Sequence, residues 1–108
     1  MLTMKILVVD DEDELRGVVM AALEAAGFQV FGASDGQEGI ESFLSYAPDL
    51  ALLDIRMPKI GGIQLCRLIR HRSEIPIIMF SAVGEREEVV EAIKNGATDC
   101  VLKTSCLA

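Results

Sequence analysis

Apolar and polar residues occur along the chain in blocks that predict five short strands separated by helices. Uninterrupted apolar runs at residues 6–9, 50–53 and 77–80 are typical of strands that are buried on both faces of a parallel sheet. Between these runs, apolar residues recur at the three- and four-residue spacing of helices that cover a sheet. The alternation predicts an α/β protein with a parallel sheet built from βαβ units.

Turn and capping residues set the expected limits of each element. Gly27, Pro48 and Gly96 end the helices that precede them, and Gly61-Gly62 opens another. Asp13 is expected to be the N-cap of the first helix. The predicted strands are residues 5–9, 28–33, 49–53, 77–80 and 98–102. The predicted helices are residues 13–26, 37–46, 61–72 and 85–95.

Acidic residues stand where two of these strands end. Asp10 and Asp11 follow the first strand, and Asp54 follows the third. The carboxyl ends of parallel strands share one edge of the sheet, which is where open α/β sheets bind ligands. Carboxylates at this density repel one another unless a cation lies among them. The pattern therefore predicts a divalent metal ion such as Mg2+.

Ser81 and Lys103 end the fourth and fifth strands and complete the expected site. Ser81 can donate a hydrogen bond to a phosphoryl oxygen, and Lys103 can place a positive charge beside another. With a metal ion in place, Asp54 can act as a nucleophile toward phosphorus, so the set suits phosphoryl transfer. His71 is expected in a helix–strand loop away from this edge.

Composition narrows the choice of function. The chain has 108 residues, enough for one domain, with 51% hydrophobic residues and a formal net charge of −7. Its basic residues are scattered, so no direct binding of nucleic acid is expected. The chain has one His and three Cys without metal-ligand spacing, so a zinc site is poorly supported. We expect the thiols to be reduced, in a cytoplasmic protein. No apolar run reaches the roughly 20 residues of a membrane span.

The residues at the strand ends resemble the receiver domain of two-component response regulators. The matching segments are Lys5–Glu12, Asp54–Pro58 with Gly61-Gly62, Phe80–Ala82, and Gly96–Asp99 ahead of Lys103. They cover nearly the whole chain in the family's order and spacing. The resemblance implies a flavodoxin-like, doubly wound sheet of five parallel strands in the order 2-1-3-4-5.

The resemblance also implies a regulatory switch and not an enzyme in the usual sense, since it would catalyse only its own phosphorylation and dephosphorylation. Asp54 would accept a phosphoryl group from a sensor histidine kinase or a phosphotransfer protein. Ser81 would be the switch hydroxyl and Lys103 the phosphate-sensing lysine. The implied Mg2+ ligands are Asp10, Asp11, Asp54 and the backbone carbonyl of Arg56. The phosphorylated surface would bind an output domain or another partner.

Three features depart from the family pattern. Thr104 follows Lys103 where the family usually has a proline in a cis bond, so a trans bond is expected there. Receivers joined to helix-turn-helix output domains often lack this proline, which hints at a DNA-binding output domain in the parent chain. Cys100 stands at the usual aromatic position and is expected, like Cys66, to be a small core residue. The family's final helix is missing.

Residues 1–108 are thus expected to be a receiver domain truncated before its last helix, with the natural sequence continuing into an amphipathic helix. Without that helix, apolar side chains of the strands at 6–9, 77–80 and 98–102 would meet water. A chain of this length standing alone would self-associate through that face, for example as a homodimer.

Two other functions fit part of the pattern. A haloacid-dehalogenase-like phosphatase would use Asp10 as its nucleophile, but this reading leaves Pro58 and Gly61-Gly62 unexplained. A pseudo-receiver would bind partners without phosphate. The run Glu85-Arg86-Glu87-Glu88 predicts a solvated first helical turn, with part of an output surface as the alternative.

Overall fold

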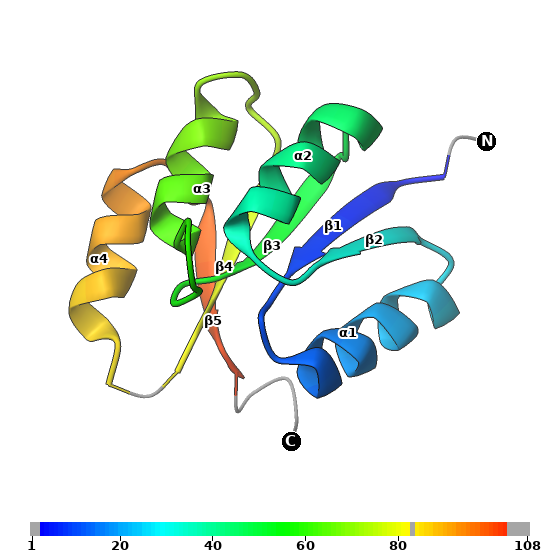
Figure 1. Ribbon diagram of the computed structural model, residues 1–108, viewed down its shortest axis with the longest axis horizontal. Coiled ribbons are helices and arrows are strands. Elements are labelled where there is room, and N and C mark those ends of the chain that lie inside the picture. The colour runs from blue at the N-terminus through cyan, green and yellow to red at the C-terminus, as the bar shows by residue number, and fades with distance from the viewer. Residues whose placement is uncertain (1–2, 83, 104–108) are drawn as a thin grey trace.

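The computed structural model describes residues 3–82 and 84–103, and five strands alternate there with four helices (Figure 1). The strands are β1 (Lys5–Val9), β2 (Gln29–Ala33), β3 (Leu50–Asp54), β4 (Ile77–Ser81) and β5 (Asp99–Leu102). The helices are α1 (Asp13–Ala25), α2 (Gly36–Tyr46), α3 (Gly62–Arg70) and α4 (Arg86–Lys94). Every predicted element is present close to its expected limits. The bond that precedes Thr104 lies outside the described residues.

The sheet is parallel throughout, with the strand order β2-β1-β3-β4-β5. β2 lies on one side of β1, whereas β3, β4 and β5 follow in order on the other side. β1 and β3 are therefore neighbours at the point where the strand order reverses, which is where open α/β sheets bind ligands. The register aligns Val9 with Leu53 and Leu53 with Met79, which brings the carboxyl ends of the central strands to one edge. The predicted flavodoxin-like fold is confirmed.

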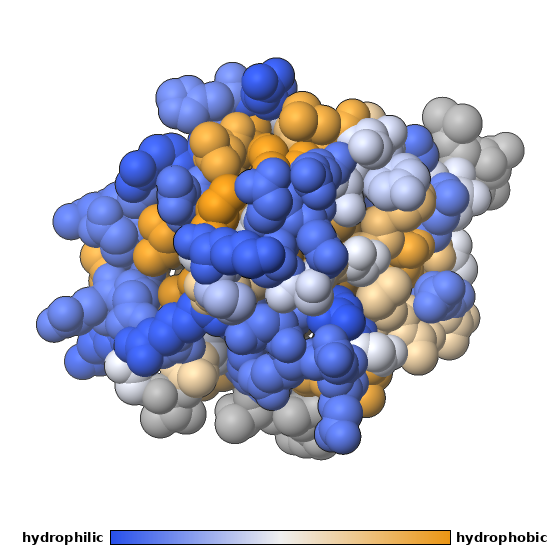
Figure 2. Space-filling model, in the orientation of Figure 1, coloured by the Kyte–Doolittle hydropathy of each residue, from blue (hydrophilic) through white to orange (hydrophobic). Residues whose placement is uncertain are grey.

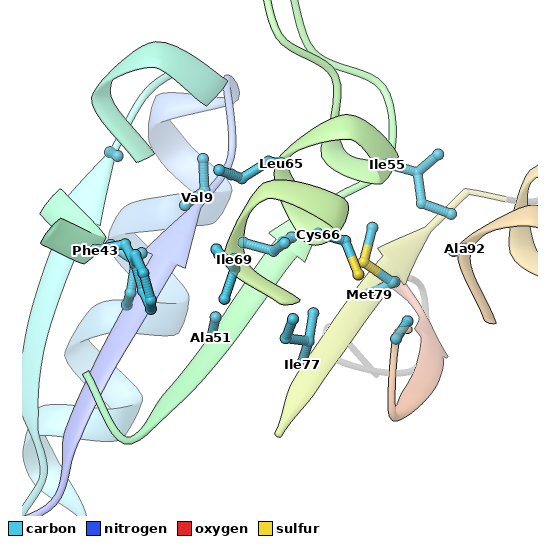
Figure 3. Close-up of a cluster of buried hydrophobic side chains, with 14 residues drawn as sticks. Val9, Phe43, Ala51, Ile55, Leu65, Cys66, Ile69, Ile77, Met79 and Ala92 are labelled. Atoms are coloured by element: carbon cyan, nitrogen blue, oxygen red, sulfur yellow. The ribbon is translucent and has the colours of Figure 1, made fainter. Parts of the chain in front are cut away.

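The main core lies between one face of the sheet and helices α2, α3 and α4 (Figures 1 and 3). Leu65, Cys66 and Ile69 of α3 are fully buried. In Figure 3, Leu65 lies beside Val9, Ile69 beside Ala51 and Cys66 beside Met79. Burial of each large apolar side chain contributes about 1.5–3 kcal/mol. The core, including the predicted Cys66, therefore holds the strand ends in place.

Helix α1 contacts β1 and β2 from the other face of the sheet. Ile6 and Val8 of β1 are buried, so the prediction that residues 6–9 would meet water is wrong for this strand, which α1 contacts. Phe80 is also buried, whereas Ile78 and Val101 on β4 and β5 are half-buried. Leu50 and Leu52 of β3, which align with Ile6 and Val8, are half-buried as well, so incomplete cover of this face extends from β3 to β5.

The face shown in Figure 2 is mostly hydrophilic, with apolar residues exposed in separate patches. Large exposed apolar side chains occur on the outer sides of three helices: Val18, Leu44, Tyr46, Val90 and Ile93. Within the described residues, no helix has the length and apolar character needed to cross a membrane.

The start of α1 differs from the expectation. The N-cap is Glu12, whose side chain makes no capping hydrogen bond, and Asp13 is the first helical residue. The amide of Glu12 instead donates to Oδ1 of Asp10 at 2.9 Å. Asp13 pairs with Arg16 at 2.8 Å. The Asp10 carboxylate, directly after β1, therefore accepts the hydrogen bond of a main-chain amide at the start of α1.

The loop between β3 and α3 is fixed by a close approach at Gly62. The Gly62 amide donates to the carbonyl of Ile55 at 2.8 Å. A Cβ atom on Gly62 would lie 1.9 Å from the carbonyl oxygen of Asp54 and would clash with it. Only glycine permits this contact, which holds the loop against the end of β3.

Gly62→Ala is expected to lower the free energy of unfolding by about 1–3 kcal/mol, because the loop must move away from Asp54. Gly17→Ala is the matched control: Gly17 lies in α1, and a Cβ there meets no atom within 4 Å. That substitution should stabilise the protein by about 0.5–1 kcal/mol through helix propensity. Urea unfolding measures both. An unchanged midpoint for Gly62→Ala would show that the contact is not restrictive.

Candidate functional site

The acidic residues at the carboxyl ends of β1 and β3 meet at the edge of the sheet. Because Val9 aligns with Leu53, the next residues, Asp10 and Asp54, are neighbours. These two are 1% and 2% exposed, whereas Asp11 is exposed to solvent. One carboxylate oxygen from each of the three lies within 4.8 Å of the others. The predicted acidic cluster is present.

Lys103 reaches this cluster from the end of β5, the edge strand next to β4. It follows β5, and its ammonium nitrogen lies 3.2 Å from Oδ1 of Asp54 and 3.8 Å from Oδ2 of Asp10. Glu12 accepts a hydrogen bond from the same ammonium at 2.9 Å. The Lys103 side chain is 15% exposed, so solvent screens these contacts only in part. One cation therefore faces several carboxylates.

This imbalance changes the protonation equilibria of the site. Burial, and then the charge of Asp10, raise the pKa of Asp54 to about 7, although Lys103 acts in the opposite direction. Burial also raises the pKa of Asp10, against the effects of the Glu12 amide and Lys103. Burial alone would lower the pKa of Lys103, but the hydrogen bond to Glu12 and the charge of Asp54 raise it. Lys103 thus does not compensate the buried carboxylates fully.

Asp10 has an oxygen available for a further ligand. Its Oδ1 accepts the Glu12 amide, but its buried Oδ2 has no hydrogen-bond partner among residues 3–82 and 84–103. A buried charged oxygen without a donor is unfavourable. A hard cation bound by this oxygen and the carboxylates beside it would remove that penalty. By donor type and burial, the acidic cluster fits a divalent metal ion.

Ser81 and Arg56 lie at the same edge in different surroundings. Ser81 ends β4, directly after Phe80, which aligns with Asp54. It is 2% exposed, and the residue after it, Ala82, lines the pocket beside Asp54. Arg56 also lines this pocket, while its side chain pairs with residues near α4. The roles expected for the Ser81 hydroxyl and the Arg56 carbonyl stay predictions.

The pocket beside Asp54 has a volume of about 310 Å3 and combines residues from four separate segments. Its lining residues are Asp11, Glu12, Asp54, Arg56, Ala82, Gly84, Glu85 and Lys103. His71 is the C-cap of α3 and lies outside this set, as predicted. The pocket thus holds a mixed set of acidic and basic groups, of which the carboxylates of Asp54 and Glu85 are buried.

Two acidic residues of this lining, Glu12 and Glu85, were not predicted to belong to the site. Glu12 directly follows Asp10-Asp11, and this position near a strand end could have predicted that it belongs to the site. Glu85 gave none, because acidic residues in a first helical turn are usually solvated. The expected solvated turn is confirmed for Glu87, which is exposed, and is wrong for Glu85, which is 5% exposed.

Comparison with known proteins agrees with this geometry. The family model for the response regulator receiver domain matches residues 6–107. Transcriptional regulatory protein CseB of Streptomyces coelicolor is 44% identical over 98 residues, which are 91% of this chain and 42% of that protein. The chain therefore spans about two fifths of the length of this curated relative.

Solved structures agree as well. A response regulator receiver domain protein from Clostridium thermocellum superposes with a TM-score of 0.86 at 30% identity, covering 93% of this chain and 82% of that one. The response regulator domain of CheB from Thermotoga maritima gives 0.85 at 32% identity, covering 94% and 78%. The chain belongs to the response regulator receiver domain family, which is regulatory. The haloacid-dehalogenase-like alternative gains no support.

Without metal, the contribution of Asp54 to stability should fall as pH rises from about 4 to about 7. The folded-state pKa of Asp54, about 7, lies above its ordinary value. The folded state therefore binds this proton more tightly than the unfolded state and loses that advantage across this window. Asp54→Asn should be more stable than the unmodified protein above pH 7, by more than about 1 kcal/mol.

Urea unfolding in EDTA at a series of pH values tests this expectation. The gap between Asp54→Asn and the unmodified protein should close toward about pH 4. Asp13→Asn, which changes an exposed carboxylate outside the cluster, is the control and should show no such trend. A stability difference for Asp54→Asn that does not vary with pH would contradict the raised pKa.

Proposed function

We propose that this chain is a phosphorylation-dependent signalling switch that accepts a phosphoryl group on Asp54. The main support is the surroundings of this carboxylate, which is buried at the switch point of the sheet. Asp10 offers an oxygen without a donor beside it, and the Lys103 ammonium lies 3.2 Å away. The adjoining pocket has room for a phosphoryl group. A sensor histidine kinase or a phosphotransfer protein would supply that group.

The proposed transfer is a displacement at phosphorus. A carboxylate oxygen of Asp54 attacks the phosphorus of a phosphohistidine, the P–N bond breaks, and its electron pair stays on the imidazole nitrogen. The carboxylate carries no proton when it attacks, so no general base is required. Mg2+ would neutralise charge on the phosphoryl oxygens and the carboxylates. Its proposed ligands are Asp10, Asp11, Asp54 and the backbone carbonyl of Arg56.

The response follows from the change in charge. An acyl phosphate on Asp54 adds negative charge and acceptor oxygens to a pocket where Lys103 already faces several acids. In the proposal, the ammonium of Lys103 turns to these oxygens and the Ser81 hydroxyl donates to another. The loops after β3 and β4 follow, and the surface formed by α4 and β5 changes its affinity for a partner. This is a shift between two populations that phosphorylation biases.

The relatives suggest what reads this surface. CseB is a transcriptional regulatory protein, and the chain corresponds to 42% of its length. We therefore infer a DNA-binding output domain or a partner with that role, acting in the cytoplasm. The domain itself would not contact nucleic acid, in keeping with its net charge of −7.

Asp54→Asn should abolish labelling by acetyl phosphate in the presence of Mg2+, because the nearly isosteric amide is not a nucleophile. Mass spectrometry of the trapped acyl phosphate measures the result and locates the label. Asp13→Asn is the control and should be labelled like the unmodified protein. Label on Asp10 would instead favour phosphatase-like chemistry, and an unlabelled protein would favour a phosphate-independent interaction module.

Asp11→Ala should weaken Mg2+ binding by at least about tenfold, since it removes one of few charged ligands. The chain contains no Trp, so isothermal calorimetry is the better measurement. Asp13→Ala removes a nearby exposed carboxylate that lies outside the cluster, and it should bind Mg2+ with unchanged affinity. Undiminished affinity in Asp11→Ala would remove this residue from the proposed metal site.

A further inference from the structure

Glu85 is a buried carboxylate at the entrance to α4, and the proposed phosphoryl transfer gives it no role. It is the residue directly before this helix and is 5% exposed. It lines the same pocket as Asp54 and Lys103. Carboxylates are rarely buried unless they are paired, so its partners indicate what keeps it there.

Both carboxylate oxygens of Glu85 have partners. Oε1 accepts a hydrogen bond from the main-chain amide of Ala82, and Oε2 lies 3.0 Å from Nε of Arg56. Arg56 also makes two contacts with Glu88 in the first turn of α4, one of them at 2.9 Å. The loop after β3 is thereby tied to the start of α4 through charged groups.

The Ala82 amide is well placed to bind an anionic oxygen. It belongs to the residue directly after β4, and Ala82 lines the pocket beside Asp54. A carboxylate oxygen of Glu85 already accepts its hydrogen bond. A phosphoryl group on Asp54 would bring three acceptor oxygens into a pocket whose wall carries several acids and two bases, Arg56 and Lys103. The phosphoryl group and Glu85 would compete for this donor and repel each other.

We propose that Glu85 is an internal competitor of the phosphoryl group. Its carboxylate occupies the Ala82 amide in the unphosphorylated protein and must leave before a phosphoryl oxygen can bind there. This inference rests on the proposed phosphorylation of Asp54. It makes Glu85 a positioning residue that restrains the reaction and sets how much phosphodonor is needed.

The same displacement couples the chemistry to the partner surface. Gly84, directly before Glu85, has φ +95° and no atom within 4 Å of a Cβ position, so the chain can turn at this residue. Departure of Glu85 releases Arg56 from one of its two acidic partners and moves the start of α4. A change in the pocket beside Asp54 would thereby shift the start of α4 through the side chain of Glu85, which contacts both.

Glu85→Ala tests the proposal with acetyl phosphate as the probe and Mg2+ present. The rate of Asp54 phosphorylation at low donor concentration should rise about tenfold, and half-maximal rate should need less donor. Glu85→Gln should give a smaller rise, because its amide oxygen still accepts from Ala82 without the repelling charge. Glu87→Gln, at an exposed position of α4, is the control and should react like the unmodified protein.

An amide spectrum of the metal-free protein gives a second readout. The Ala82 amide resonance should move in Glu85→Ala and stay in place in Glu87→Gln. If Asp54 is labelled at the same rate in Glu85→Ala, Glu85→Gln and the unmodified protein, the competitor role is wrong while the proposed function stands. If the unmodified protein takes no label on Asp54, both are wrong.

Discussion

The ammonium group of Lys103 lies among three carboxylates, and its single positive charge cannot neutralise all of them. Exposed carboxylates could tolerate this in water, but Asp10 and Asp54 are buried, where the effective dielectric is lower and uncompensated charge is more unfavourable. The carboxylates cannot separate, because the register of β1 and β3 fixes their positions. The unliganded domain therefore carries an excess of negative charge at this edge whenever these carboxylates are ionised. A bound cation, or a change of charge on Asp54, acts on this excess directly.

The fold tolerates such a site because its stability comes from elsewhere. Three helices bury a continuous apolar core against one face of the sheet, and α1 covers β1 and β2 on the other. The contact between Gly62 and the carbonyl of Asp54 then fixes the loop that leaves the site. Packing against both faces of the sheet keeps the buried carboxylates of the site together despite their mutual repulsion.

Much of this arrangement could be predicted from the sequence. Continuous apolar runs indicate parallel strands, and parallel strands place Asp10, Asp54 and Lys103 at one edge whatever their side chains contact. Contacts within loops could not be predicted in this way. Periodicity does not indicate that Arg56 reaches a helix 32 residues away, or that Glu85 is drawn inward by a main-chain amide. The expected cap at Asp13 failed for a similar reason, since Asp10 takes a nearby donor.

Lys103 and Glu12 are 91 positions apart in the sequence, yet they share a hydrogen bond. The first residues of the site are therefore made early during synthesis on the ribosome, and their counterion is made last. A nascent chain that has formed β1 and β3 already holds the acidic pair, but it lacks the lysine until β5 has joined β4. In the proposed function, a partly synthesised domain would therefore hold the acceptor Asp54 before the sensing lysine that answers to it.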